Sequence, residues 1–68
     1  MALVELARFP TKVEADIARL LLEAEGLDVI LFDEGINHLL GGFMPVRVMI
    51  PEEQSEAAAG LLVEEGLL

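Results

Sequence analysis

A capped amphipathic segment near the start of the chain restricts the fold more than any other feature of the sequence. Thr11 and Glu14 have the spacing of a capping box, in which each side chain bonds the free backbone N–H of the other. Gly26 stands where a residue with positive φ ends a helix. The segment therefore predicts a helix from Thr11 to Glu25. Apolar residues recur at helical spacing and form the one apolar stripe of this amphipathic helix, the side expected to face the core: Val13, Ile17, Leu20, Leu21 and Ala24.

Strands are predicted on both sides of this helix, over residues 2–9, 27–33 and 43–50, because these runs are rich in aliphatic and β-branched residues. Leu27 is also placed to pack on Leu22 at the end of the helix. A connector over residues 34–42 holds the break Gly41-Gly42, which permits positive φ.

A second helix is predicted over residues 51–65, because Pro51 suits a first helical turn. Its expected buried stripe consists of Ala57, Ala58, Leu61 and Leu62. Gly60 interrupts that helix, and close packing against the sheet is the expected reason. No internal repeat is evident.

The order strand, helix, strand, strand, helix predicts a single ferredoxin-like domain over residues 1–68, an α+β two-layer sandwich. A right-handed crossover places both helices on one face of a three-stranded antiparallel sheet with strand order 1-3-2. The fourth strand of that architecture is expected to be missing, since Gly66 stops the second helix and only Leu67-Leu68 follows it. The first strand is therefore expected at a sheet edge.

Composition argues against several functions. The 68 residues contain no cysteine, 13 acidic and only 4 basic residues, with a formal net charge of −9. Nucleic acid and anionic membranes need clustered basic residues, so neither is an expected partner. Thr11 and Ser55 lack a neighbouring base, and His38 is the only histidine, so we expect no enzyme, no metal site and no cofactor.

The sequence also bears on location. No apolar run approaches the ~20 residues that a membrane span needs. The N-terminal residues have no basic flank before a long apolar run, so no signal peptide is expected. Without cysteines the chain suits a reducing compartment, and the cytoplasm is the expected location.

Two stretches carry a resemblance to a known family. The stretches are ADIARLLLEAEG, residues 15–26, and VRVMIPEEQSEAA, residues 46–58. They resemble a family of short bacterial domains of unknown function that is described as a putative prokaryotic signal-transducing protein. That family combines a helix ending in Leu-x-x-x-Gly, a Gly-Gly turn, a strand and a Pro-Glu-Glu. Its fold is similar to that of the nitrogen-regulatory PII proteins, so the resemblance implies a ferredoxin-like sandwich and a regulatory role.

The sheet face away from the helices is the expected binding surface. Arg47 and Met49 alternate with Val46, Val48 and Ile50, and so should project from that face. The second strand adds either Ile30 and Phe32 or Val29 and Leu31. A largely apolar face with one arginine predicts a homodimer or another protein partner, through this face, the edge of the first strand, or both.

The alternative function is a small-ligand sensor. In that interpretation the loop over residues 33–45 closes on a pocket, and His38 and Arg47 supply its polar contacts. Asp33, at the start of this loop, is a further candidate site residue. Phe32 and Met49 complete the candidate site under either interpretation.

Overall fold

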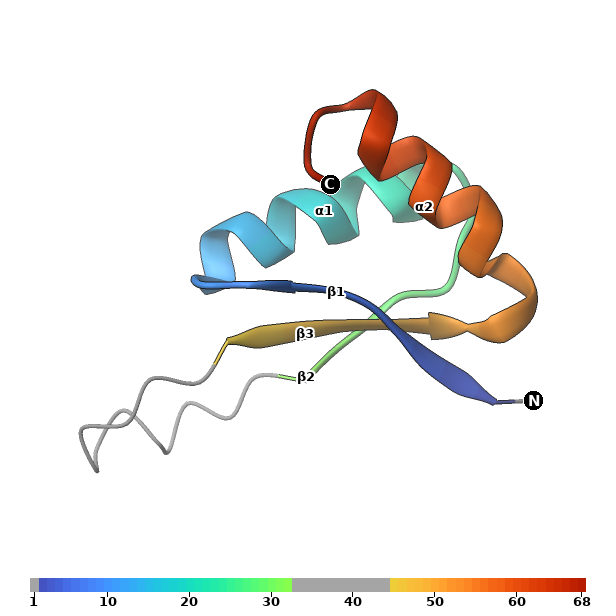
Figure 1. The fold of residues 1–68 in the computed structure, drawn as a ribbon, viewed down its shortest axis with the longest axis horizontal. Coiled ribbons are helices and arrows are strands. Elements are labelled where there is room, and N and C mark those ends of the chain that lie inside the picture. The colour runs from blue at the N-terminus through green and yellow to red at the C-terminus, as the bar shows by residue number, and fades with distance from the viewer. Residues whose placement is uncertain (1, 33–44) are drawn as a thin grey trace.

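A computed structural model describes residues 2–32 and 45–68, which form a sheet covered on one face by two helices (Figure 1). The elements are β1 (Leu3–Phe9), α1 (Lys12–Ala24), β2 (Ile30–Phe32), β3 (Val46–Pro51), the 3-10 helix η2 (Glu52–Gln54) and α2 (Ser55–Glu64). β3 lies between β1 and β2 and pairs antiparallel with both. The predicted α+β sandwich with strand order 1-3-2 is confirmed.

The capping signals of α1 are confirmed in large part. The Thr11 hydroxyl accepts a hydrogen bond from the Glu14 backbone N–H at 3.3 Å, although the return bond of a full capping box is not formed between these two residues. At the other end Gly26 has φ 82°, and the Leu27 N–H bonds the Leu22 carbonyl at 3.1 Å. This is the Schellman ending that the sequence predicts.

The predicted buried stripe of α1 is wrong. The residues that α1 buries are Ala15, Ala18 and Leu22, whereas Val13 and Leu20 keep 70% and 57% of their surface exposed. Two alanines facing the sheet let the helix backbone approach closely, so the smaller residues fill the interface. The larger aliphatic residues lie on the opposite side of the same helix.

The second helical segment begins later than predicted. Pro51 is the last residue of β3 and is buried opposite Leu3, so it belongs to the sheet rather than to the first turn of the helix. A 3-10 turn follows, and the Ser55 hydroxyl bonds the Glu52 carbonyl at 2.8 Å before α2 begins.

The buried stripe of α2 is also narrower than predicted. Ala58 and Leu62 are buried and Leu61 is half-buried, but Ala57 is exposed. Gly60 is exposed, and apart from its own stretch of helix nothing lies within 4 Å of where its Cβ would stand, so close packing against the sheet does not explain this glycine.

β2 begins three residues later than predicted. Leu27 closes the end of α1, and the Asp28 N–H bonds the side-chain oxygen of Gln54 at 2.9 Å. These contacts take Leu27 and Asp28 out of the sheet, and pairing with β3 starts at Ile30. The predicted connector over residues 34–42 and the first two residues of the predicted third strand lie outside the described part of the chain.

α1 and α2 end alike, which the sequence analysis did not detect. The pattern Ala-x-x-Leu-Leu-x-x-Glu-Gly-Leu occurs at residues 18–27 and again at residues 58–67. Gly66 has φ 76°, and the Leu67 N–H bonds the Leu62 carbonyl at 2.8 Å, which repeats the ending of α1. The two helices therefore pack on the sheet through Ala and Leu residues at equivalent positions.

Candidate functional site

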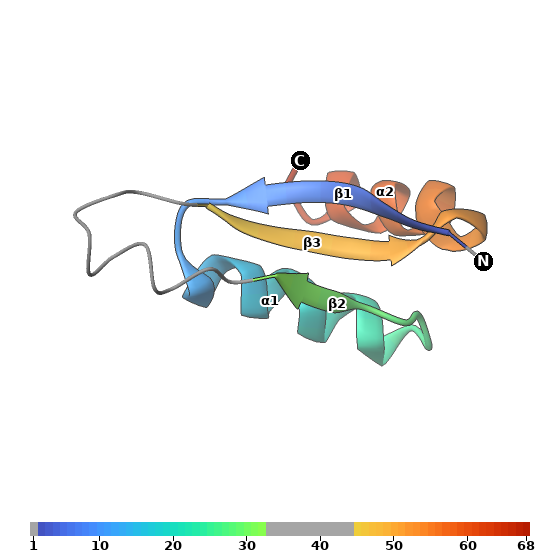
Figure 2. The ribbon, with the colours of Figure 1, turned by 90° about the horizontal axis from the view of Figure 1, so that it is seen from below.

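The sheet face away from the helices, here called the open face, is built by alternation along β3. Val46, Val48 and Ile50 point into the core, with 3%, 0% and 0% of their surface exposed. Arg47 and Met49 therefore lie on the other side. Figure 2 shows the strands in front of the helices, so the open face is turned toward the viewer.

Cross-strand pairing settles which residues of β2 share the open face. Ile30 is paired with Met49, and Phe32 with Arg47. Ile30 and Phe32 are 44% and 38% exposed, and Leu3 at the start of β1 is 43% exposed. The alternative pair, Val29 and Leu31, packs against the core.

Arg47 and Phe32 contact each other directly. The guanidinium carbon of Arg47 lies 5.4 Å from the centre of the Phe32 ring, within the range of a cation–π interaction. The guanidinium thus lies over the Phe32 ring, on a face where Arg47 is half-buried and Phe32 is exposed. Three of the predicted site residues, Arg47, Phe32 and Met49, are brought together here.

The open face is more polar than predicted, because β1 contributes a second arginine and a carboxylate. Glu5 is paired with Met49, and Arg8 with Arg47. Arg8 Nε donates to a Glu5 carboxylate oxygen at 2.8 Å, and this bond raises the pKa of Arg8. The prediction of one arginine failed because the register of β1 was not known from the sequence.

The other two predicted site residues cannot be placed. Asp33 and His38 lie outside the described residues, and so does most of the loop that the ligand-sensor interpretation uses. Within residues 2–32 and 45–68, no three His, Cys, Asp or Glu side chains are grouped as metal ligands. In the same part of the chain, neither helix has the length and apolar character that crossing a bilayer requires.

Comparison with known proteins gives one result. Residues 3–66 match the family model described as "Putative prokaryotic signal transducing protein". The chain belongs to this family. The resemblance seen in the sequence is therefore confirmed over nearly the whole chain. No curated protein and no solved structure gives a significant match.

This member of the family also exposes a second apolar surface, which sequence reasoning missed by assigning it to the core. Val13, Ile17 and Leu20 form a stripe on the side of α1 away from the sheet, and are 70%, 48% and 57% exposed. The signal was present as alanines at the positions that are buried, Ala15 and Ala18.

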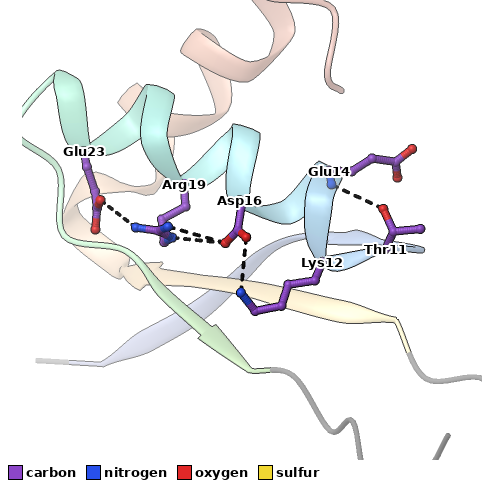
Figure 3. Close-up of polar contacts among 6 residues, drawn as sticks. All are labelled: Thr11, Lys12, Glu14, Asp16, Arg19 and Glu23. Atoms are coloured by element: carbon purple, nitrogen blue, oxygen red, sulfur yellow. Dashed lines mark hydrogen bonds and ion pairs between the residues drawn. The ribbon is translucent and has the colours of Figure 1, made fainter.

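One flank of this stripe carries a charge network (Figure 3). Asp16 bonds Lys12 at 3.2 Å and Arg19 at 3.4 Å, and Arg19 also bonds Glu23 at 2.9 Å. The Lys12 hydrogen bond is the main cause that lowers the pKa of Asp16, and Arg19 acts in the same direction. Both basic residues of α1 are thus paired on one side of the helix.

The other flank faces α2 across a shallow hollow of about 300 Å³. Its lining combines apolar residues with carboxylates: Leu21, Ala24, Glu25, Leu61, Glu64 and Glu65. None of the three glutamates belongs to an ion pair within the described residues. Leu21 and Leu61 are half-buried whereas the three glutamates are exposed, so this flank is apolar inside and negatively charged at its rim.

Proposed function

We propose that the protein is a non-catalytic binding module of signal transduction that forms a homodimer through the open face. The observation that carries the proposal is the placement of Ile30, Phe32 and Met49 together on a face that neither helix of the described residues covers. Aromatic residues, Met and Arg are the types enriched at protein interfaces, and the open face contains all three. Membership of a family described as signal-transducing supports the regulatory part of the proposal.

The charge of the open face also favours self-association. The chain has a formal net charge of −9, so two copies repel each other over most of their surface. Among the described strand residues, the open face instead carries Arg8 and Arg47 with Glu5, which is two of the chain's four basic residues against one carboxylate. A twofold dimer that places this face against itself keeps most carboxylates far apart.

The open face is a better candidate for the dimer contact than the outer edge of β1. Among the described residues no strand pairs with the outer edge of β1, so its backbone groups could bind another strand. The register shifts between Glu5 and Ala7, however, and such a bulge bends an edge strand and interrupts a regular ladder. We therefore assign the contact to the side chains of the face.

Sedimentation velocity from low to high micromolar concentration tests the dimer. We expect wild type to dimerise, and the variant Ile30→Ser/Phe32→Ser to bind itself about tenfold or more weakly, since each buried apolar side chain contributes about 1.5–3 kcal/mol. Val63→Ser is the matched control, because Val63 is 60% exposed on α2. A wild type that stays monomeric at high micromolar concentration refutes the proposal.

Two further parts of the proposal concern the environment of the protein. We assign it to the cytoplasm, where a chain without cysteines needs no oxidising compartment. We also propose that it binds no nucleic acid, because it has only four basic residues and Lys12 and Arg19 are paired with carboxylates of α1. Retention on a heparin column at physiological salt would contradict this assignment.

A further inference from the structure

We infer that the protein has a second binding surface, on the helix layer, which takes a basic amphipathic helix of another protein. It comprises the exposed stripe of α1 and the hollow between α1 and α2, and is called here the helix groove. The groove lies on the opposite layer from the open face (Figure 2) and does not depend on the proposed dimer. Apolar contact and charge complementarity carry the inference.

The apolar part of the groove is long enough for helix recognition. Val13, Ile17 and Leu20 are spaced i, i+4 and i+7, so they extend about 10 Å along the helix at 1.5 Å per residue. Leu21 and Leu61 continue the apolar surface into the hollow. A docked amphipathic helix presents its own anchors over i to i+7, which is the same length, so it can cover the stripe with two helical turns.

α1 is apolar on two opposite sides, and within residues 2–32 and 45–68 only one of these sides is buried against the core. Ala15, Ala18 and Leu22 are each 0% exposed against the sheet. A surface helix that only covers a core has polar residues on its outer side. In α1 the outer side instead carries a Val, an Ile and a Leu, and a contiguous apolar patch of this kind marks an interaction site.

The rim of the groove specifies the charge of the partner. Glu25, Glu64 and Glu65 line the hollow and are in no ion pair of the described residues. Lys12 and Arg19, which could neutralise them, are held by Asp16 and Glu23 on the other flank of α1. A helix with leucines on one side and lysines or arginines beside them satisfies both parts of the groove.

The negative charge of the helix groove argues against two other occupants, a second copy of this chain and an anionic membrane. A second copy of this chain would bring the same three glutamates against each other, and like charges across an interface oppose docking. An anionic membrane is repelled for the same reason. The partner that the groove favours is therefore cationic and apolar on one side.

The probe is a synthetic 18-residue peptide of leucine and lysine with all leucines on one helical side, labelled with fluorescein. Fluorescence anisotropy measures its affinity for the wild-type protein. A peptide of the same composition with scrambled order has no apolar side and serves as the control for simple charge attraction. We expect the amphipathic peptide to bind about tenfold or more tightly than the scrambled one, because only it covers the apolar stripe.

Three double variants separate the contributions of the apolar stripe and the charged rim to binding. Ile17→Ser/Leu20→Ser removes apolar contact at exposed positions and should weaken binding about tenfold or more. Glu64→Gln/Glu65→Gln removes two rim charges, and Glu52→Gln/Glu53→Gln removes two exposed charges before α2. We expect the rim pair to weaken binding several-fold more than the matched pair.

Three results would overturn the inference. The first is equal binding of the two peptides, or equal effects of the two glutamine pairs, which would show diffuse charge attraction. The second is an oligomer that Ile17→Ser/Leu20→Ser converts to monomer, which would assign the groove to a second copy. The third is sedimentation with phosphatidylcholine vesicles that the same variant abolishes. Thermal melting by circular dichroism checks that each variant is folded.

Discussion

At the scale of single residues, one glycine inside α2 and one that follows its end offer a paired test of the backbone conformation. Gly66 has φ 76°, where an alanine is strained, whereas Gly60 lies inside the helix and has open space where a Cβ would stand. We expect Gly66→Ala to lower the free energy of unfolding by about 1 kcal/mol. Gly60→Ala should raise it by up to about 1 kcal/mol, because alanine has the higher helix propensity.

Urea unfolding at one fixed protein concentration measures both glycine variants. Each is the control for the other, since both add the same methyl group to the same helical segment. A destabilising Gly60→Ala would mean that Gly60 touches something that the isolated chain does not show. A neutral Gly66→Ala would mean that the end of α2 does not need its positive φ.

The sequence predicted single residues correctly where their conformation or direction depends only on residues nearby in the chain. Gly26 and Gly66 were recognised as helix stops because a left-handed backbone leaves a strong residue preference. Arg47 and Met49 were placed on the open face because alternation along a strand is strict. The position of Arg8 opposite Arg47 depends on the register between two strands, and a bulge at residues 5–7 changes that register.

At the scale of elements, the existence of each helix and strand was predictable but the buried side of α1 was not. The larger residues Val13, Ile17 and Leu20 suggested the core, whereas the core uses Ala15 and Ala18. Hydrophobicity alone cannot distinguish these sides, because helix-to-sheet distance decides whether small or large residues fit. The repeat of Ala-x-x-x-Leu at the ends of both helices was the available signal, since both copies are fully buried.

This repeat predicts similar costs for truncating its two leucines. Leu22 and Leu62 are each 0% exposed and occupy equivalent places before the glycine stops. Leu22→Ala and Leu62→Ala should each lower the free energy of unfolding by about 3 kcal/mol, through lost burial and the remaining cavity. Leu20→Ala is the control on the outer side of α1 and should change it by less than about 0.5 kcal/mol.

Chemical denaturation of these three variants shows which side of α1 belongs to the core. If Leu20→Ala cost as much as Leu22→Ala, the outer stripe would belong to a core, and the helix groove could not be a free surface. If Leu62→Ala were nearly neutral, α2 would contribute little to stability and the two helix ends would not be equivalent. The m-value should stay constant across the series, since all three proteins unfold the same fold.

At the scale of the whole molecule, the two layers separate two surfaces of different charge. The open face carries Arg8, Arg47 and Glu5, whereas the helix groove is rimmed by glutamates without ion pairs among the described residues. A chain with a net charge of −9 thus keeps two of its four basic residues on one sheet face. That arrangement suits a module that pairs with itself on one side and receives a cationic helix on the other.

If the two surfaces act separately, their affinities should be independent. They share no residue, and the described core lies between the sheet and the helices (Figure 1). Substitutions at sites without shared partners usually add, within about twofold in affinity. The variant Ile30→Ser/Phe32→Ser should therefore bind the leucine-lysine peptide as wild type does, with one peptide per subunit.

Isothermal titration calorimetry measures the affinity and stoichiometry of the peptide for both proteins. It is done at high micromolar protein concentration, because wild type is then expected to be dimeric and the variant monomeric. Equal affinity and equal stoichiometry per subunit would show that self-association only sets how many helix grooves one particle carries. Two linked grooves would then hold a bivalent partner more tightly than a single groove, through effective concentration alone. A large loss of affinity in the monomeric variant would instead mean that pairing at the sheet changes the helix layer, and the protein would act as a switch rather than as a divalent scaffold.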